Sequence, residues 1–219
     1  MNSTELLARF RLDTRDTGHP QLWSDDEIYS YLDDAQKMFC RLTGGLADAT
    51  SSACARLKAK SGVSYAALSP RVLKVRAAFG ADGKKLDIVN FEDLEFSSTS
   101  GEELFAGTTG TVTTVIVGME PNKVKLINTP DADQTINLIV YRLPLDDITE
   151  SGMDLEIDEQ HHLALLKWAQ RLAHMKTDAE TYDRGRADQF ELEFRNYCEQ
   201  ARDERGRREH KHRLMAFSW

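Results

Sequence analysis

The chain has few of the residues that build disulfide frameworks or metal centres. It contains three cysteines in 219 residues, namely Cys40, Cys54 and Cys198, and these are widely spaced. The sequence has no Cys-x-x-Cys pair, and no histidine lies near a cysteine in a zinc-finger spacing. This pattern argues against a cysteine-based zinc site and a paired disulfide scaffold, so we expect three packing residues of a reducing compartment.

Long apolar runs are also missing. No stretch approaches the roughly 20 apolar residues that a membrane-spanning helix needs. The first residues, 1–7, read Met-Asn-Ser-Thr-Glu-Leu-Leu and have neither the basic nor the apolar region of a secretion signal. We therefore expect no membrane partner and a protein that is made in the cytosol and stays there unless it is packaged in a particle.

Positive charge is in deficit, since the formal net charge is -8 and the sequence pI is near 5.3. The whole chain therefore offers no general attraction to a nucleic-acid backbone, and any basic contact has to be local. Hydrophobic residues make up 41% of the chain. This is too many for wholesale disorder and enough for one sizeable domain or two small ones.

Signatures of catalysis are equally scarce. No serine lies in a Gly-x-Ser-x-Gly setting, and the stretch 107–110 (Gly-Thr-Thr-Gly) lacks the Lys-Ser/Thr ending and the helix of a phosphate loop. His161 and His162 are adjacent and point to different sides of a helix, so we interpret them as a solvated helix start. We predict no catalytic, cofactor-binding or metal-binding residue, and no enzyme.

Acidic pairs offer the remaining route to metal or acid–base chemistry. Their places on helix starts and loops favour solvated, helix-capping charge over a cation site. The pairs are Asp25-Asp26, Asp33-Asp34 and Glu102-Glu103.

Helical patterns occupy both ends of the chain. Ser3 or Thr4 can cap a short first helix, and Ser24 caps a stronger second one that stops at Gly44 and Gly45. Asp158 begins a helical pair with a break near 177–179. Apolar residues recur in the last long helix at steps of three and four, which predicts a buried face. These are Ala187, Phe190, Phe194, Tyr197 and Ala201.

The middle of the chain has the pattern of short strands separated by turn residues. Because the connections are too short for helical crossovers, we expect a small antiparallel sheet. The predicted strands are 72–79, 86–89, 111–117, 123–127 and 135–141.

The predicted fold is α+β, a helical bundle with an inserted small antiparallel β domain and an extended C-terminal arm. We place N-terminal helices of the bundle at 1–60, the β-rich insertion at 61–150, the closing helical pair at 151–201 and the arm at 202–219. The arm combines a charged run with an apolar, aromatic tip, and large apolar residues on a tail favour a partner groove.

Two phrases of the sequence combine helix and strand signals in a distinctive order. The first is 22–36, Leu-Trp-Ser-Asp-Asp-Glu-Ile-Tyr-Ser-Tyr-Leu-Asp-Asp-Ala-Gln, which opens a helix. The second is 65–76, Tyr-Ala-Ala-Leu-Ser-Pro-Arg-Val-Leu-Lys-Val-Arg, which precedes and begins a strand. Together they resemble the head-to-tail adaptor family of short-tailed bacteriophages, whose members are also called tail tubular or connector proteins. The closing helical pair with its charged extension is similar as well. Such phrases indicate packing and turns rather than chemistry.

The resemblance implies a structural virion protein without cofactors. Twelve copies would form a ring, with the portal above, the tail nozzle below and DNA passing through the lumen without specific binding. A tail fibre is a further candidate partner, and assembly would take place in the host cytoplasm. We expect the arm to dock on the portal, with cationic residues pairing carboxylates and apolar residues as anchors. These are Arg205, Arg207, Arg208, Lys211, Arg213, Leu214, Phe217 and Trp219.

Three rival functions stay open at this point. The first is a tail-completion or neck protein of a long-tailed phage, which differs in stoichiometry and neighbours. The second is a nucleic-acid-binding regulator that uses residues 202–213, against which the net charge of -8 argues. The third is a metal-dependent hydrolase that uses His161, His162 and the acidic pairs.

Overall fold

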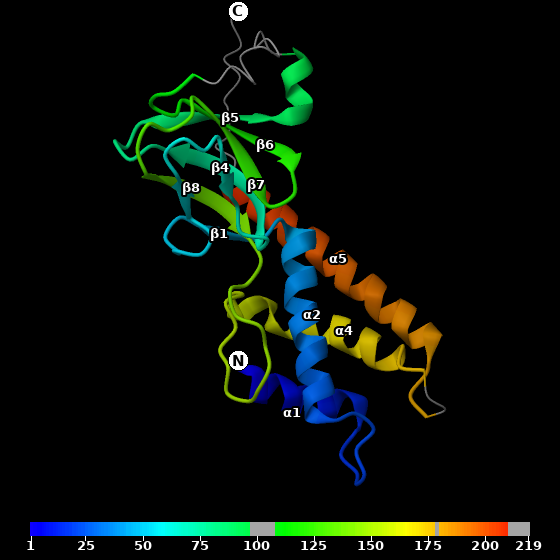
Figure 1. Cartoon of the computed structure of the whole chain (residues 1–219). Helices are drawn as coiled ribbons and strands as arrows, with labels where there is room; N and C mark the ends of the chain where they lie inside the picture. Colours follow the sequence, from blue (N-terminus) through cyan, green and yellow to red (C-terminus); the bar gives the residue numbers. More distant parts are fainter. Residues whose placement is uncertain (97–107, 178–179, 210–219) are drawn as a thin grey trace, which may run out of the picture. The chain divides into compact units, whose positions relative to one another are not determined.

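The computed structural model describes residues 1–96, 108–177 and 180–209. These residues form two compact units (Figure 1). The helical unit combines Met1–Gly44 with the chain from Pro144 onward, and the sheet unit is Gly45–Leu143. The sheet unit is therefore an insertion into the helical unit.

Helix α1 (Ser3–Thr14) begins one or two residues earlier than a cap at Ser3 or Thr4 predicts. Asn2 is the N-cap, and it forms a reciprocal capping box with Glu5. The Ser3 hydroxyl makes tertiary contacts instead, since it accepts from the Met153 backbone N–H at 3.0 Å and donates to the carbonyl oxygen of Glu150 at 2.8 Å. A tertiary contact thus shifts the cap to the neighbouring asparagine.

Helix α2 (Asp25–Thr43) has the two ends that the sequence predicts. The Ser24 hydroxyl accepts a hydrogen bond from the Glu27 backbone N–H, and the Glu27 carboxylate accepts one from the Ser24 backbone N–H. Three acidic residues occupy the first turn, where they favour the positive end of the helix dipole. Gly44 ends the helix with φ of 93°, a conformation that glycine adopts without steric cost.

The second half of the helical unit is a pair of packed helices. A 3-10 turn, η2 (Glu159–His161), leads into α4 (His162–His174), and α5 (Arg184–Glu209) follows. The two helices pack side by side in Figure 1. They run antiparallel, since the ion pairs between them join Lys167 to Glu193 and Arg171 to Glu191.

The helical unit has its own apolar core. Residues from α1, α2 and α4 meet there with the segments 15–24 and 144–158, which connect these elements. Burial of these side chains is the main favourable term for this unit, because each large apolar one contributes roughly 1.5–3 kcal/mol. The cluster comprises Leu6, Phe10, Trp23, Ile28, Tyr29, Leu32, Ile148, Leu166, Ala169 and Ala173.

In the sheet unit, eight strands of the described residues form one curled sheet. Their order is β1-β8-β4-β5-β6-β7-β3, and β2 also pairs with β8. β8 pairs with three strands, since β1 and β2 pair with its two ends on one side and β4 lies on the other. The strands are β1 (Leu46–Asp48), β2 (Arg56–Ala59), β3 (Tyr65–Ala67), β4 (Val72–Phe79), β5 (Lys85–Asn90), β6 (Thr114–Glu120), β7 (Lys123–Ile127) and β8 (Gln134–Arg142).

One pair of strands in this sheet is parallel. Asp87 to Asn90 of β5 align with Thr114 to Val117 of β6 in the same direction. A parallel pair needs a long crossover, and the connection between these strands includes the 3-10 helix η1 (Phe91–Phe96). All other pairs are antiparallel.

The expected fold class, a helical bundle with a small inserted antiparallel β domain, is wrong, while residues 210–219 of the expected extended arm lie outside the described residues. The structure is a sheet-rich mixed α/β fold: its sheet begins at Leu46 and contains a parallel pair. Strands β1, β2 and β3 are short and rich in alanine and polar residues, so pairing with β8 and β7 rather than local propensity makes them strands. Residues 202–209, assigned to the arm, continue helix α5.

Candidate assembly site

The described part of the predicted docking segment is the last two turns of α5. Arg205 is half-buried there, and its guanidinium donates to the carbonyl oxygen of Thr43 at 3.5 Å. Thr43 is the last residue of α2, where backbone carbonyls lack partners within the helix and attract a cation. Arg205 therefore helps to fix the end of α5 against the end of α2.

Arg207 and Arg208 differ from Arg205 because both are exposed. Among the residues that the structure describes, no carboxylate forms an ion pair with either guanidinium. Both are thus available to a partner. Five further predicted docking residues lie outside the described residues: Lys211, Arg213, Leu214, Phe217 and Trp219.

The base of this segment is a firmly packed stretch of α5. Phe194 is fully buried and packs on Trp168, with ring centroids 5.2 Å apart, which confirms the predicted core face. Glu191 accepts from Arg171 at 2.6 Å and from Arg195 at 2.8 Å. Burial raises the pKa of Glu191, but these hydrogen bonds outweigh burial and lower it. The ionised carboxylate therefore ties α5 to α4.

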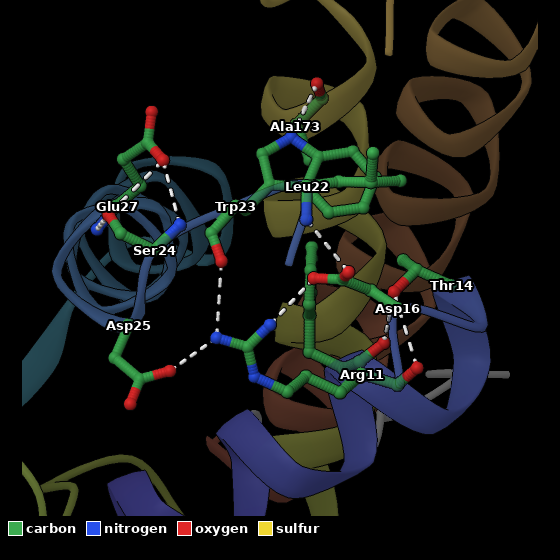
Figure 2. A network of polar contacts seen from close by, with 10 residues as sticks. Arg11, Thr14, Asp16, Leu22, Trp23, Ser24, Asp25, Glu27 and Ala173 are labelled. Carbon is green, nitrogen blue, oxygen red and sulfur yellow. Dashed lines mark hydrogen bonds and ion pairs between the residues drawn. The ribbon is translucent and has the colours of Figure 1, made fainter. Parts of the chain in front are cut away.

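The first phrase of the family resemblance forms a packed junction (Figure 2). Trp23 is buried, and its indole N–H donates to the carbonyl oxygen of Ala173, near the end of α4, at 3.2 Å. Its ring meets Phe10 edge-on, with a centroid separation of 5.7 Å. One side chain thus joins α1, the segment before α2 and the end of α4.

Arg11 organises the polar half of the same junction, as Figure 2 shows. Its guanidinium donates to Asp16 at 2.6 Å, to the carbonyl oxygen of Trp23 at 3.1 Å and to the Asp25 carboxylate. Asp16 also accepts from the backbone N–H of Leu22 at 2.9 Å. The phrase therefore holds the start of α2 in place, and its residues carry no reactive arrangement.

The expectation of solvated histidines at the start of the closing helical pair is wrong. His161 lies between the rings of Phe39 and Tyr197, at centroid distances of 4.9 and 5.8 Å, and its Nδ1 is 3.0 Å from the Tyr197 hydroxyl. Burial lowers the pKa of His161. His162 is buried, with Nε2 2.7 Å from the Ile157 carbonyl oxygen. Both rings take part in packing that the chain order alone does not reveal.

The family of the chain follows from its sequence as a whole. The family model described as SU10 adaptor protein matches residues 1–214. The chain belongs to the SU10 adaptor protein family. This confirms the resemblance to phage head-to-tail adaptors, which rested on two phrases and the order of the helices. No curated protein matches the chain.

An SU10 adaptor is a structural protein of the bacteriophage virion, placed at the head-tail junction in contact with portal and tail proteins. The family is one of structural adaptors and not of enzymes. Burial raises the pKa of the Cys198 thiol to about 12, so this cysteine is a packing residue and not a nucleophile. Cys40, Cys54 and Cys198 are all buried, which confirms the prediction that they are packing residues.

Two further tests concern metal and membrane. In the described ranges, no group of three or more histidine, cysteine or acidic side chains is arranged to hold a metal ion. Nor is any helix of the described chain both long and apolar enough to cross a membrane.

Sequence reasoning missed a basic surface on the sheet unit of the adaptor. Arg56 and Lys58 on β2, Lys74 and Arg76 on β4 and Lys85 on β5 are all exposed. The spacing of two residues within β2 was a usable signal, because alternate residues of a strand lie on the same face. The prediction placed no strand at 56–59, so the shared face of Arg56 and Lys58 could not be recognised.

Proposed function

We propose that the chain forms a ring of twelve copies that joins the portal to the tail nozzle and lets DNA pass through its lumen. The observation that carries this proposal is the family match over residues 1–214. A ring of identical subunits uses heterologous contacts that close, which suits a junction between two other rings.

The distribution of charge supports a channel role. Acidic and basic residues are equal in number within 45–143, so the net charge of -8 belongs to the sequence of the helical unit. An acidic lumen repels the phosphate backbone and lets the genome slide without binding.

Portal docking is assigned to the end of α5 and the residues that follow it. Arg207 and Arg208 supply exposed cations without ion-pair partners in the described part of the chain. Phe217 and Trp219 are the proposed apolar anchors, with Lys211, Arg213 and Leu214 beside them. Arg205 has a double role in this proposal, because it also contacts Thr43.

The test uses particles that contain portal and DNA but no tail. Purified full-length chain is mixed with them, and co-sedimentation, DNA retention and the number of copies per particle in electron micrographs are measured. We expect a closed ring of twelve copies and retained DNA. A chain that fails to attach, or that attaches elsewhere on the particle, would contradict the proposal and favour another neck or tail component.

Two variants locate the docking segment in the same assay. A chain ending at Glu209 keeps the described helix, and Arg207→Glu with Arg208→Glu reverses the two exposed charges; both should lose attachment. Arg184→Glu with Arg186→Glu is the matched control, since both residues are exposed at the other end of α5. If both test variants attach as well as the control, the portal contact lies elsewhere.

A further inference from the structure

The register of the sheet places five basic residues on one face. Arg56 lies opposite Asn137, Asn137 opposite Phe79, and Phe79 opposite Lys85, which makes one row across β2, β8, β4 and β5. Residues directly opposite each other project to the same side of a sheet. With strands about 4.8 Å apart, this row is about 15 Å long.

The same face continues along the strands. Lys58 lies opposite Thr135, and Lys74 lies opposite Tyr141. Arg76 follows a bulge in β4, and its guanidinium lies over the Tyr141 ring at 5.8 Å and donates to the Tyr141 hydroxyl at 3.1 Å. We call this surface, Arg56, Lys58, Lys74, Arg76 and Lys85, the basic face.

The basic face is exposed and its charges are not neutralised within the described chain. All five side chains are exposed, and none forms an ion pair with a described carboxylate. Other cations of the sheet unit do have such partners, namely Lys84 with Asp82, Lys123 with Glu120 and Arg142 with Asp48.

An ordinary solvated sheet face would not have this composition. The outer face of an antiparallel sheet is polar, but stable surfaces mix charges of both signs. Asp87 of β5 lies two residues after Lys85 and so on the same face, where it is the one acidic residue of the described β2, β4, β5 and β8 strands against five basic ones. Like charges that lie on one face repel one another, and a partner that supplies negative charge relieves this repulsion.

The same polypeptide contains a surface of opposite sign. Seven acidic residues lie within 146–159, and no lysine or arginine occurs in 143–166. Asp146, Glu150, Asp154 and Asp158 are exposed, and their carboxylates have no ion pair within the described residues. We call these four the acidic segment.

We propose that the basic face of one copy binds the acidic segment of a second copy. This inference rests on the proposed ring, and it names the surfaces that close the contact between neighbouring subunits. Both surfaces are unpaired in the single chain and complementary in charge. A nucleic-acid backbone could pair with the basic face but would leave the acidic segment without a partner, so DNA binding is treated as an outcome of the test.

Such a contact has definite properties. In the proposed ring each copy offers its basic face to one neighbour and its acidic segment to the other, which is a heterologous contact. Exposed charge pairs steer association and are screened by salt, so assembly should weaken as ionic strength rises.

The experiment reverses each surface separately in the full-length chain. The face variant is Lys58→Glu, Lys74→Glu and Lys85→Glu, and the segment variant is Asp146→Lys, Glu150→Lys and Asp154→Lys. The matched control is Arg9→Glu, Arg184→Glu and Arg186→Glu, which changes the charge as the face variant does, at exposed residues of the helical unit. Circular dichroism first verifies that each variant is folded.

The first measurement is self-association of the purified chain at low salt, by sedimentation equilibrium and by chemical cross-linking between copies. The second is the number of copies per portal-bearing particle. We expect each test variant alone to lose about tenfold or more in cross-linked neighbours, because several charge pairs are replaced by like-charge contacts. An equal mixture of the face variant and the segment variant should recover the cross-linked neighbours, since a ring in which the two variants alternate has complementary charges at every contact. The control should behave as the original chain.

The outcomes separate the two proposals. If the original chain attaches to portal as a ring and the face variant does so equally well, the ring stands and the basic face is not the contact. If the original chain does not attach to particles, the proposed junction fails, while self-association still tests the face. Titration with labelled duplex DNA completes the set: DNA binding lost in the face variant, with neighbour contacts unchanged, would make the face a nucleic-acid surface and overturn the inference.

Discussion

At the scale of single residues, the sheet unit depends on an ion pair that is almost fully removed from water. Arg142 Nε donates to the Asp48 carboxylate at 2.6 Å, and the two side chains are 10% and 4% exposed. The other carboxylate oxygen accepts from the backbone N–H groups of Thr50 and Ser51 at 2.9 and 3.0 Å. Because these bonds satisfy both oxygens, the buried charge is compensated rather than destabilising.

This pair gives the sheet unit a defined response to acid. Burial raises the pKa of Asp48, but the hydrogen bonds from Ser51, Thr50 and Arg142 together outweigh it and hold that pKa well below its usual range. A carboxyl with a lowered pKa in the folded state stabilises the fold fully above its unfolded pKa of about 3.9. That contribution is lost as the pH falls below about 4.

We therefore expect Asp48→Asn to lower the free energy of unfolding by about 3–5 kcal/mol at pH 7, since it leaves a buried arginine without its counter-ion. The difference from the original chain should shrink as the pH drops below about 4. Urea unfolding from pH 7 to pH 2.5 measures both effects, and the exposed Asp87→Asn serves as control. A difference that stays constant down to pH 2.5 would show that the pair does not set the acid response.

At the scale of secondary-structure elements, the sequence predicted strands wherever β-branched residues are dense. β4 (Val72–Phe79) and β7 (Lys123–Ile127) match the predicted ranges, and β8 extends one residue beyond its predicted range at each end. β1 and β2 were missed because their residues have low strand propensity and acquire their structure by pairing with β8. The parallel β5–β6 pair was missed because the segment between those strands was treated as a short connection.

Helices were easier to predict, since capping and periodicity are local. Ser24, Gly44 and the buried face of α5 with Phe194 follow from sequence alone. The packing of His161 between Phe39 and Tyr197 does not, because it joins three elements that are distant in the chain.

The face of α5 provides a prediction for this element. Phe194→Ala should lower the free energy of unfolding by about 3–5 kcal/mol, because the ring is 0% exposed and its removal leaves a cavity beside Trp168. Leu192→Ala, two residues away on the same helix, should change it by less than about 0.5 kcal/mol, since Leu192 is 60% exposed. Denaturant unfolding of both variants makes the comparison, and equal effects would mean that α5 packs by a different face.

At the scale of the whole molecule, the family was predictable while the fold class was not. The resemblance rested on the 22–36 and 65–76 phrases, and the first of these proves to be a packing junction built around Trp23. Local sequence patterns do not reveal how many strands the sheet has, because β1, β2 and β3 become strands only by pairing with β8 and β7, which lie far along the chain. The predicted small insertion therefore became a unit that spans Gly45–Leu143.

The entry and exit of that unit lie next to each other. Leu46 of β1 is the register partner of Arg142 of β8, so their Cα atoms are about 5 Å apart. A Cβ on Gly45, whose φ is 90°, would meet the Arg142 carbonyl oxygen at 2.9 Å. The sheet unit could thus be removed and the gap closed with little strain or loop entropy.

We expect residues 45–143 to be replaceable by a linker of about three glycines, because the helical unit has an apolar core of its own. The remaining chain should show the circular dichroism spectrum of helices and a cooperative thermal transition. The separate fragment 45–143 should show the circular dichroism spectrum of a β-sheet and a cooperative transition of its own. Replacement of 61–150 instead, the boundaries read from the sequence, is the matched control. It leaves β1 and β2 without β8 and removes Ile148, a buried residue of the helical core, so that chain should not unfold cooperatively. If both shortened chains melt alike, Gly45 and Leu143 do not bound an independent unit.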